Sequence, residues 1–102
     1  MFETIAEIFN TIRWGSLQSI IAFVHPDDFA FVNDVRMTTL RESGVAPFTI
    51  QTSDDASIAG TDADGNNRVD YGCPKPGHVI FVEERSRGVF VRTMTHTPKE
   101  TY

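Results

Sequence analysis

Oxygen-bearing side chains gather in one stretch of the chain, between residues 62 and 70. Asp62, Asp64, Asn66 and Asp70 provide three carboxylates and one amide within nine residues. Calcium ions bind about six to eight oxygen atoms, many of them from Asp, Glu and Asn side chains. These four residues are therefore the candidate ligands of a calcium site, and apart from this alternative the sequence predicts no cofactor.

The Asp62–Asp70 stretch resembles the first nine positions of an EF-hand or dockerin-type calcium loop. This resemblance implies side-chain ligands at the first, third, fifth and ninth positions and a backbone carbonyl ligand at the seventh. Two positions depart from the family: Asn67 replaces the glycine of the sixth position, and Cys73 replaces the glutamate of the twelfth. Because Asp-Gly and Asn-rich pairs also form turns without a metal, a plain hairpin turn is the alternative interpretation.

Cys73, the single cysteine, is a candidate nucleophile because His78 follows it closely in sequence. A reactive thiolate needs a nearby base or a helix N-terminus. The stretch 76–91 is similar to the histidine-bearing hairpin of the cysteine, histidine-dependent amidohydrolase/peptidase domains, where the base begins a strand as His78 does. This resemblance implies a small cysteine-dependent hydrolase. That family's cysteine lies upstream at a helix start, where this chain has His25-Pro26-Asp27-Asp28. A small, partly buried Cys73 without a catalytic role is the alternative.

Three arginines lie on or beside the expected turn of a C-terminal hairpin, namely Arg85, Arg87 and Arg92. A two-stranded ribbon with a basic tip can enter a nucleic-acid groove. However, Glu83 and Glu84 precede the turn, and 9 Lys and Arg against 14 Asp and Glu give the chain a formal net charge of -5. Phosphate repels an acidic chain of this kind. We therefore expect no nucleic-acid partner and assign Arg85 and Arg87 to a protein contact.

The apolar residues of segment 2–14 repeat with the spacing of an amphipathic helix. Its bulky apolar stripe could dock on a neighbouring chain, because Trp and Phe are common interface anchors. The candidate partner-binding residues are Phe2, Ile5, Phe9, Ile12 and Trp14 on this helix, the acidic pair Asp54 and Asp55, and the hairpin residues Arg85 and Arg87. An ordinary core helix is the alternative interpretation of the same stripe.

These residues must be positioned by two helices and several strands. A second helix is predicted over 26–42, because Pro26 and two following aspartates form a helix start. Strands are predicted over 17–24 and 45–52, with shorter ones near 57–59 and 68–71. The clearest element is a β-hairpin whose strands span 78–84 and 89–95, with Gly88 at the positive-φ position of its loop.

The composition favours a sheet, because 2 Leu stand against 9 Val, 8 Ile, 8 Phe and 11 Thr. The 102 residues fit one domain, residues 1–102, with a frayed tail expected over 97–102. The element order predicts an α+β fold, with a mostly antiparallel sheet and helices packed on one face. Both hairpin strands are nearly continuous in apolar residues, so we expect the hairpin to be covered on its second face as well.

The sequence shows no complete catalytic set and no cofactor loop. It therefore predicts a non-enzymatic protein–protein interaction module, either an assembly subunit or a small accessory or inhibitory factor. The partner would be another protein or a further copy of the chain. Small acidic chains of this kind occur among phage-encoded accessory and virion proteins. The chain lacks a basic signal-peptide segment and an apolar run long enough to span a bilayer, which predicts a cytoplasmic protein without membrane contact.

Overall fold

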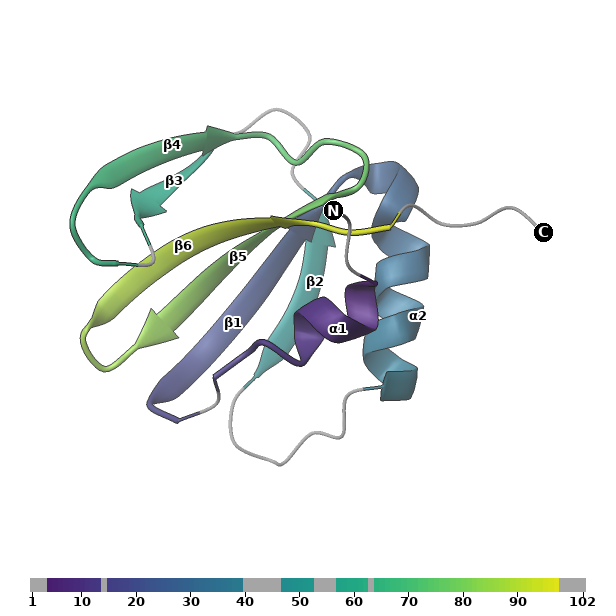
Figure 1. Cartoon of the computed structure of the whole chain (residues 1–102), viewed down its shortest axis with the longest axis horizontal. Helices are drawn as coiled ribbons and strands as arrows, with labels where there is room; N and C mark the ends of the chain where they lie inside the picture. Colours follow the sequence, from purple (N-terminus) through teal and green to yellow (C-terminus); the bar gives the residue numbers. More distant parts are fainter. Residues whose placement is uncertain (1–3, 14, 40–46, 53–56, 63, 98–102) are drawn as a thin grey trace.

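The computed structural model describes residues 4–13, 15–39, 47–52, 57–62 and 64–97 (Figure 1). Within these residues the chain forms two α-helices, one short 3₁₀-helix and six strands. In chain order they are α1 (Ile5–Phe9), β1 (Leu17–Val24), η1 (Pro26–Asp28), α2 (Phe29–Thr39), β2 (Phe48–Thr52), β3 (Ile58–Thr61), β4 (Arg68–Gly72), β5 (His78–Arg85) and β6 (Gly88–Thr95). The α+β class is confirmed. No helix within the described ranges is long and apolar enough to cross a membrane.

All six strands belong to one sheet, in the order β2-β1-β5-β6-β3-β4. The pairs β1–β5, β5–β6 and β3–β4 are antiparallel. β2 lies parallel to β1, and β3 meets β6 in parallel through the pair Thr61 and Phe90. A parallel pair needs a crossover connection. Here η1 and α2 lie in the connection between β1 and β2. The sheet is therefore mostly antiparallel and includes the predicted C-terminal hairpin, now β5 and β6.

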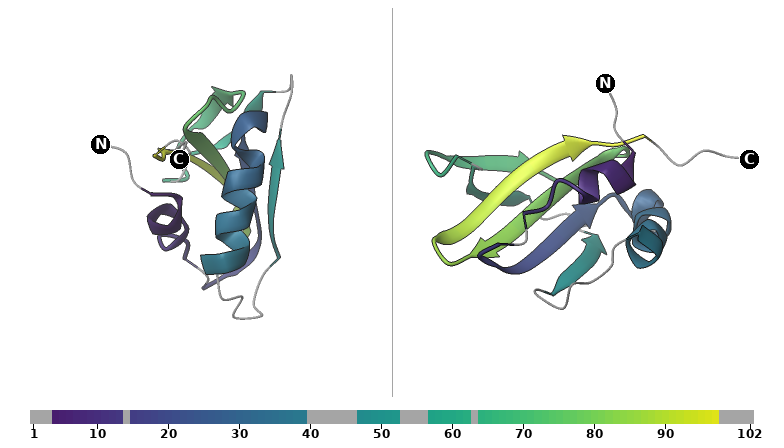
Figure 2. Two further views of the ribbon diagram at one scale, coloured as in Figure 1. Left: turned by 90° about the vertical axis from the view of Figure 1, so that its right-hand side faces the viewer. Right: turned by 60° about the horizontal axis from the view of Figure 1, so that its bottom comes forward.

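Both helices pack on the same face of the sheet (Figure 2). The ring of Phe9 on α1 lies edge-on to Phe48 and Phe81, at centroid distances of 5.3 and 6.4 Å. Val32 of α2 belongs to the same buried cluster. Alternate residues of a strand point to opposite faces, so every second strand residue points toward the helices. The strand residues of this core are Leu17, Ile20, Ala22, Val24, Phe48, Ile50, Val79 and Phe81.

The helix-free face is covered in part by the β3–β4 hairpin. Val91 is buried there, and Gly60 approaches it so closely that a Cβ at Gly60 would lie 2.6 Å from Val91 Cγ2. Tyr71 donates a hydrogen bond to the Val91 carbonyl oxygen at 3.1 Å. Half-buried apolar residues complete this face, namely Ile21, Phe23 and Val82. Helix α1 does not supply the second cover that the hairpin needs, because α1 and α2 share one face.

Helix α1 is shorter than the predicted helix 2–14. It begins after Thr4, whose Oγ1 accepts a hydrogen bond from the Glu7 backbone N–H at 3.2 Å. A threonine followed three residues later by glutamate is a recognised helix start. The helix ends at Phe9, because the backbone of residues 10–12 forms tighter turns with bonds to the third residue back. The predicted helical residues 1–3 lie outside the described residues.

The second helix begins at Pro26 as predicted, with a first turn of 3₁₀ geometry. The His25 ring accepts a hydrogen bond from the Asp27 N–H at 3.1 Å. Asp28 is buried, and its carboxylate accepts a hydrogen bond from the Gly77 N–H at 2.9 Å. Asp28 therefore fastens the helix start to the segment that leads into β5. The predicted helix end at residues 40–42 lies outside the described residues.

Candidate binding groove

A groove of about 1070 Å³ lies at the tip of the β5–β6 hairpin, on the face that carries the helices. Its floor is formed by the end of β5 and the start of β6. One wall is the connection between α1 and β1, and the other is the β3–β4 loop. In Figure 1 the β3–β4 loop and the connection between α1 and β1 lie on either side of the β5–β6 hairpin end. The charged residues that line the groove are Arg13, Asp64, Glu83, Arg85, Arg87 and Arg92.

The buried carboxylate of Glu83 organises the floor of the groove, since it is only 5% exposed. Its Oε1 accepts hydrogen bonds from Nε and Nη2 of Arg85, the former at 3.1 Å. Its Oε2 accepts a hydrogen bond from Arg92 Nε at 2.6 Å. The Arg92 guanidinium carbon also lies 4.5 Å from the centre of the Phe81 ring. Charge-assisted bonds of this kind are strong and directional, so both guanidinium groups have fixed orientations.

Arg85 also fixes one wall of the groove. Its Nη1 donates to the Gly15 carbonyl oxygen at 2.9 Å, and its Nη2 donates to the Arg13 carbonyl oxygen at 2.8 Å. Arg92 adds a bond from Nη1 to the Thr11 hydroxyl oxygen at 3.1 Å. The segment that follows α1 is therefore held against the hairpin by side chains of the groove floor.

Arg13 and Arg87 are the exposed arginines of the groove. Neither forms an ion pair with another residue in the described part of the chain. The apolar side chain on this face of the hairpin is Phe90, which is half-buried and lies opposite Glu83, and the neighbouring Val89 completes the lining. The groove thus combines two free positive charges with accessible apolar surface.

The four predicted calcium ligands are distributed along the β3–β4 hairpin. Asp62 Oδ1 accepts a hydrogen bond from the Asn66 N–H at 3.0 Å, and Asp70 Oδ1 accepts one from the Gly72 N–H at 2.9 Å. Asp64 and Asn66 are exposed in the loop. Among the described residues, no group of three His, Cys, Asp or Glu side chains could hold a metal ion. Calcium binding stays a prediction, which a calorimetric titration with Ca²⁺ in the millimolar range tests.

Hydrogen bonding in this loop lowers the pKa of Asp62 from its usual value of 3.8. The bond from the Asn66 backbone is the largest cause, and partial desolvation opposes it. Across the hairpin, the pKa of Tyr71 is raised from 10.0, chiefly by desolvation and then by the charges of Asp62 and Asp64. Neighbouring protein groups therefore shift the pKa of both the Asp62 carboxylate and the Tyr71 phenol.

The predicted partner-binding residues fall into three groups. Ile5, Phe9 and Ile12 are buried in the core at 2%, 1% and 6% exposure, as the core-helix alternative expects, and their role at a partner surface stays a prediction. They face the sheet because the helix must cover Phe48 and Phe81. Four predicted residues lie outside the described part of the chain: Phe2, Trp14, Asp54 and Asp55. Arg85 and Arg87 both line the groove, but Arg85 is engaged with Glu83 and the groove wall.

The residues of the predicted thiol chemistry lie away from the groove lining. His78 begins β5, and the hairpin expected from the resemblance is present. Cys73 follows β4 and is half-buried. The helix start at His25–Asp28 carries no cysteine, so the structure does not place a thiol where the resembling family has its nucleophile. The hydrolase interpretation remains a prediction.

Comparison with protein-family models, with curated proteins and with solved structures finds no match for this chain.

Sequence reasoning missed two groups that define the groove. Arg13 lies in no recognised motif, and in the sequence Glu83 counts only as a charge that disfavours nucleic acid. A signal for Glu83 is present in the sequence, because residues 81, 83 and 85 share one face of a strand whose residue 81 is an apolar Phe. A glutamate in line with a core phenylalanine indicates a buried charge that needs a cationic partner.

Proposed function

We propose that this protein is a non-enzymatic binding module, an assembly subunit or a small accessory or inhibitory factor, and that the groove is its binding surface. The observation that carries the proposal is the pair of exposed arginines, Arg13 and Arg87, beside accessible apolar surface. Arginine and aromatic residues are enriched where proteins bind each other.

The fixed floor supports the same proposal. Binding is tighter when the binding groups are already ordered in the free protein, because less conformational entropy is lost. Glu83 is bonded to Arg85 and Arg92, and Arg85 holds the wall through two carbonyl oxygens. The groove is therefore shaped before a partner arrives.

Site-specific photo-crosslinking tests the proposal in cells that naturally make the protein. A benzophenone amino acid in place of Val89 is expected to give a discrete adduct, because Val89 lines the groove and is exposed. The adduct's mass distinguishes another protein from a second copy of the chain. Arg87→Ala in the same chain is expected to lower the adduct yield.

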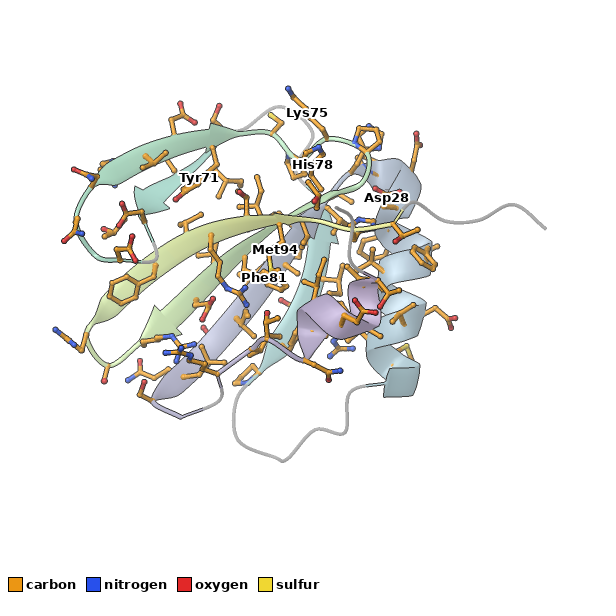
Figure 3. All side chains as sticks on the ribbon, in the orientation of Figure 1. Asp28, Tyr71, Lys75, His78, Phe81 and Met94 are labelled. Carbon is orange, nitrogen blue, oxygen red and sulfur yellow. The ribbon has the colours of Figure 1, made fainter. Side chains whose placement is uncertain are left out.

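The matched control carries the benzophenone in place of Lys75. Lys75 is exposed and lies at the other end of the hairpin from the turn (Figure 3). The absence of an adduct at position 89, or the same adducts from both positions, would show that the groove is not the binding surface.

A further inference from the structure

We infer that the groove binds an acidic peptide segment of its partner, with carboxylates that pair with Arg13 and Arg87 and an apolar side chain that contacts Phe90. This inference rests on the proposed function and adds the chemistry of the ligand.

The charges of the groove differ from those of the whole chain. Four arginines line the groove against two carboxylates, whereas the chain as a whole has a formal net charge of -5. Glu83 is already bonded to Arg85 and Arg92, so those two guanidiniums are partly neutralised. Arg13 and Arg87 keep their full charge, and an incoming carboxylate can accept two parallel hydrogen bonds from a guanidinium.

The size of the groove and the apolar residues within its mostly polar lining fit a peptide. Pockets for small molecules usually measure roughly 300–1,000 Å³, and this groove is about 1070 Å³ and open to solvent. Phe90 is half-buried, lies opposite Glu83 and presents part of its ring in the groove. A segment in which acidic and apolar residues alternate would place both kinds of side chain against matching parts of the lining.

A nucleic acid fits these observations less well. Nucleic-acid affinity comes largely from neutralising many regularly spaced phosphates with Lys and Arg. Here Asp64 lies in the groove and Glu84 is exposed on β5 near the hairpin tip. Among the described lining residues, Arg13 and Arg87 alone offer unpaired positive charge, which suits a short carboxylate-bearing segment better than a polyphosphate backbone.

Fluorescence polarisation with purified protein tests the inference. The probe is a short labelled peptide of alternating glutamate and leucine, and its control has glutamine in place of glutamate. The glutamate peptide is expected to bind more tightly. Arg13→Ala and Arg87→Ala are each expected to weaken its binding by roughly three- to fivefold, as exposed ion pairs do. Higher ionic strength is expected to weaken binding further.

Lys75→Ala is the charge-matched control and is expected to leave peptide binding unchanged. Circular dichroism checks that each variant is folded; the Arg13 and Arg87 side chains are both exposed. Equal binding of the glutamine peptide, or an equal loss with Lys75→Ala, overturns the inference. Tighter binding of an oligothymidylate of similar length also overturns it and indicates a nucleic-acid ligand. If crosslinking at position 89 succeeds but the acidic peptide does not bind, the binding module stands and only its ligand chemistry is wrong.

Discussion

At the scale of single residues, the charge of Glu83 decides how the groove is built. The Glu83 carboxylate accepts hydrogen bonds from two arginines and is buried. Removing one member of a buried ion pair leaves the remaining charges without compensation, which is more destabilising than losing an exposed pair. The contribution of Glu83 to stability is therefore expected to be much larger than that of its neighbour Glu84, which is exposed.

The first prediction concerns Glu83→Gln, which keeps the shape of the side chain and removes its charge. Arg85 and Arg92 then repel each other near the surface, and we expect the free energy of unfolding to fall by about 2–4 kcal/mol. Urea denaturation measures the change. Glu84→Gln is the control, with an expected change within about 0.5 kcal/mol. Equal effects of the two substitutions would show that Glu83 is not a structural charge.

The second prediction concerns the lowered pKa of Asp62. Because the folded pKa lies below the unfolded value, the ionised carboxylate stabilises the fold above pH 3.8, and this contribution is lost as the pH falls through the folded pKa. The difference in melting temperature between wild type and Asp62→Asn should therefore change as the pH falls from neutral to below 3.8. Asp64→Asn is the control, since no described residue donates a hydrogen bond to Asp64. A pH-independent difference would contradict the assignment.

At the scale of elements, helix α1 belongs to the core of the fold. Ile8 and Phe9 are at most 1% exposed, and Phe9 contacts strands β2 and β5 at once. The amphipathic spacing of the sequence predicted the buried stripe correctly but could not say what would cover it. Loss of the helix should therefore disrupt the sheet instead of leaving it folded.

The third prediction is that Phe9→Ala lowers the free energy of unfolding by about 3–5 kcal/mol, because the substitution opens a cavity between α1 and the sheet. Chemical denaturation followed by fluorescence or circular dichroism measures it. Met37→Ala is the control, because Met37 is 69% exposed and its truncation should have little effect. A small effect of Phe9→Ala would favour α1 as a partner surface.

The fourth prediction concerns the contact between β3 and β6. A Cβ at Gly60 would lie 2.6 Å from Val91 Cγ2, so Gly60→Ala is expected to destabilise the protein by roughly 1–3 kcal/mol. Val91→Ala removes the methyl group that would clash, and it also lowers the stability because less apolar surface is buried. In the double variant, the loss should be smaller than the sum of the two single losses. Strictly additive losses would show that the two residues do not meet.

At the scale of the whole molecule, three segments distant in sequence meet around Gly77. Its N–H donates to the buried carboxylate of Asp28, and its carbonyl accepts from the His96 N–H at 2.8 Å. The His96 ring is fully buried, with Nε2 3.8 Å from that carboxylate. The start of the second helix, the approach to β5 and the end of β6 are thus joined at one point.

The fifth prediction is that Asp28→Ala lowers the free energy of unfolding by about 1–3 kcal/mol, because the Gly77 N–H loses its acceptor in a buried place. Asp27→Ala is the control. The Asp27 side chain is 84% exposed, and we expect a loss below about 1 kcal/mol from its interaction with the helix dipole. Hydrogen exchange of the Gly77 amide provides a second measurement, and unchanged protection in Asp28→Ala would contradict the link.

The sequence was a good guide to local structure and a poor one to long-range contacts. Alternating and continuous apolar runs located β1, β5 and β6. Gly88 has the predicted positive φ, at 140°, but it is the first residue of β6 instead of a loop residue. The length of α1 was overestimated, because apolar spacing continues to Ile12 while the backbone leaves the helix after Phe9. The groove depends on Arg85 bonding to carbonyl oxygens about seventy residues earlier, and no local pattern encodes such a pairing.

The arrangement of Glu83, Arg85 and Arg92 also constrains how the sequence can change in evolution. Loss of the glutamate alone leaves two facing cations, and loss of either arginine alone leaves a buried anion with fewer partners. These three positions are therefore expected to be inherited together or replaced together by neutral residues. Arg13 and Arg87 carry no such constraint, so they are free to vary with the ligand, and divergent descendants of this chain could change what they bind without rebuilding the sheet.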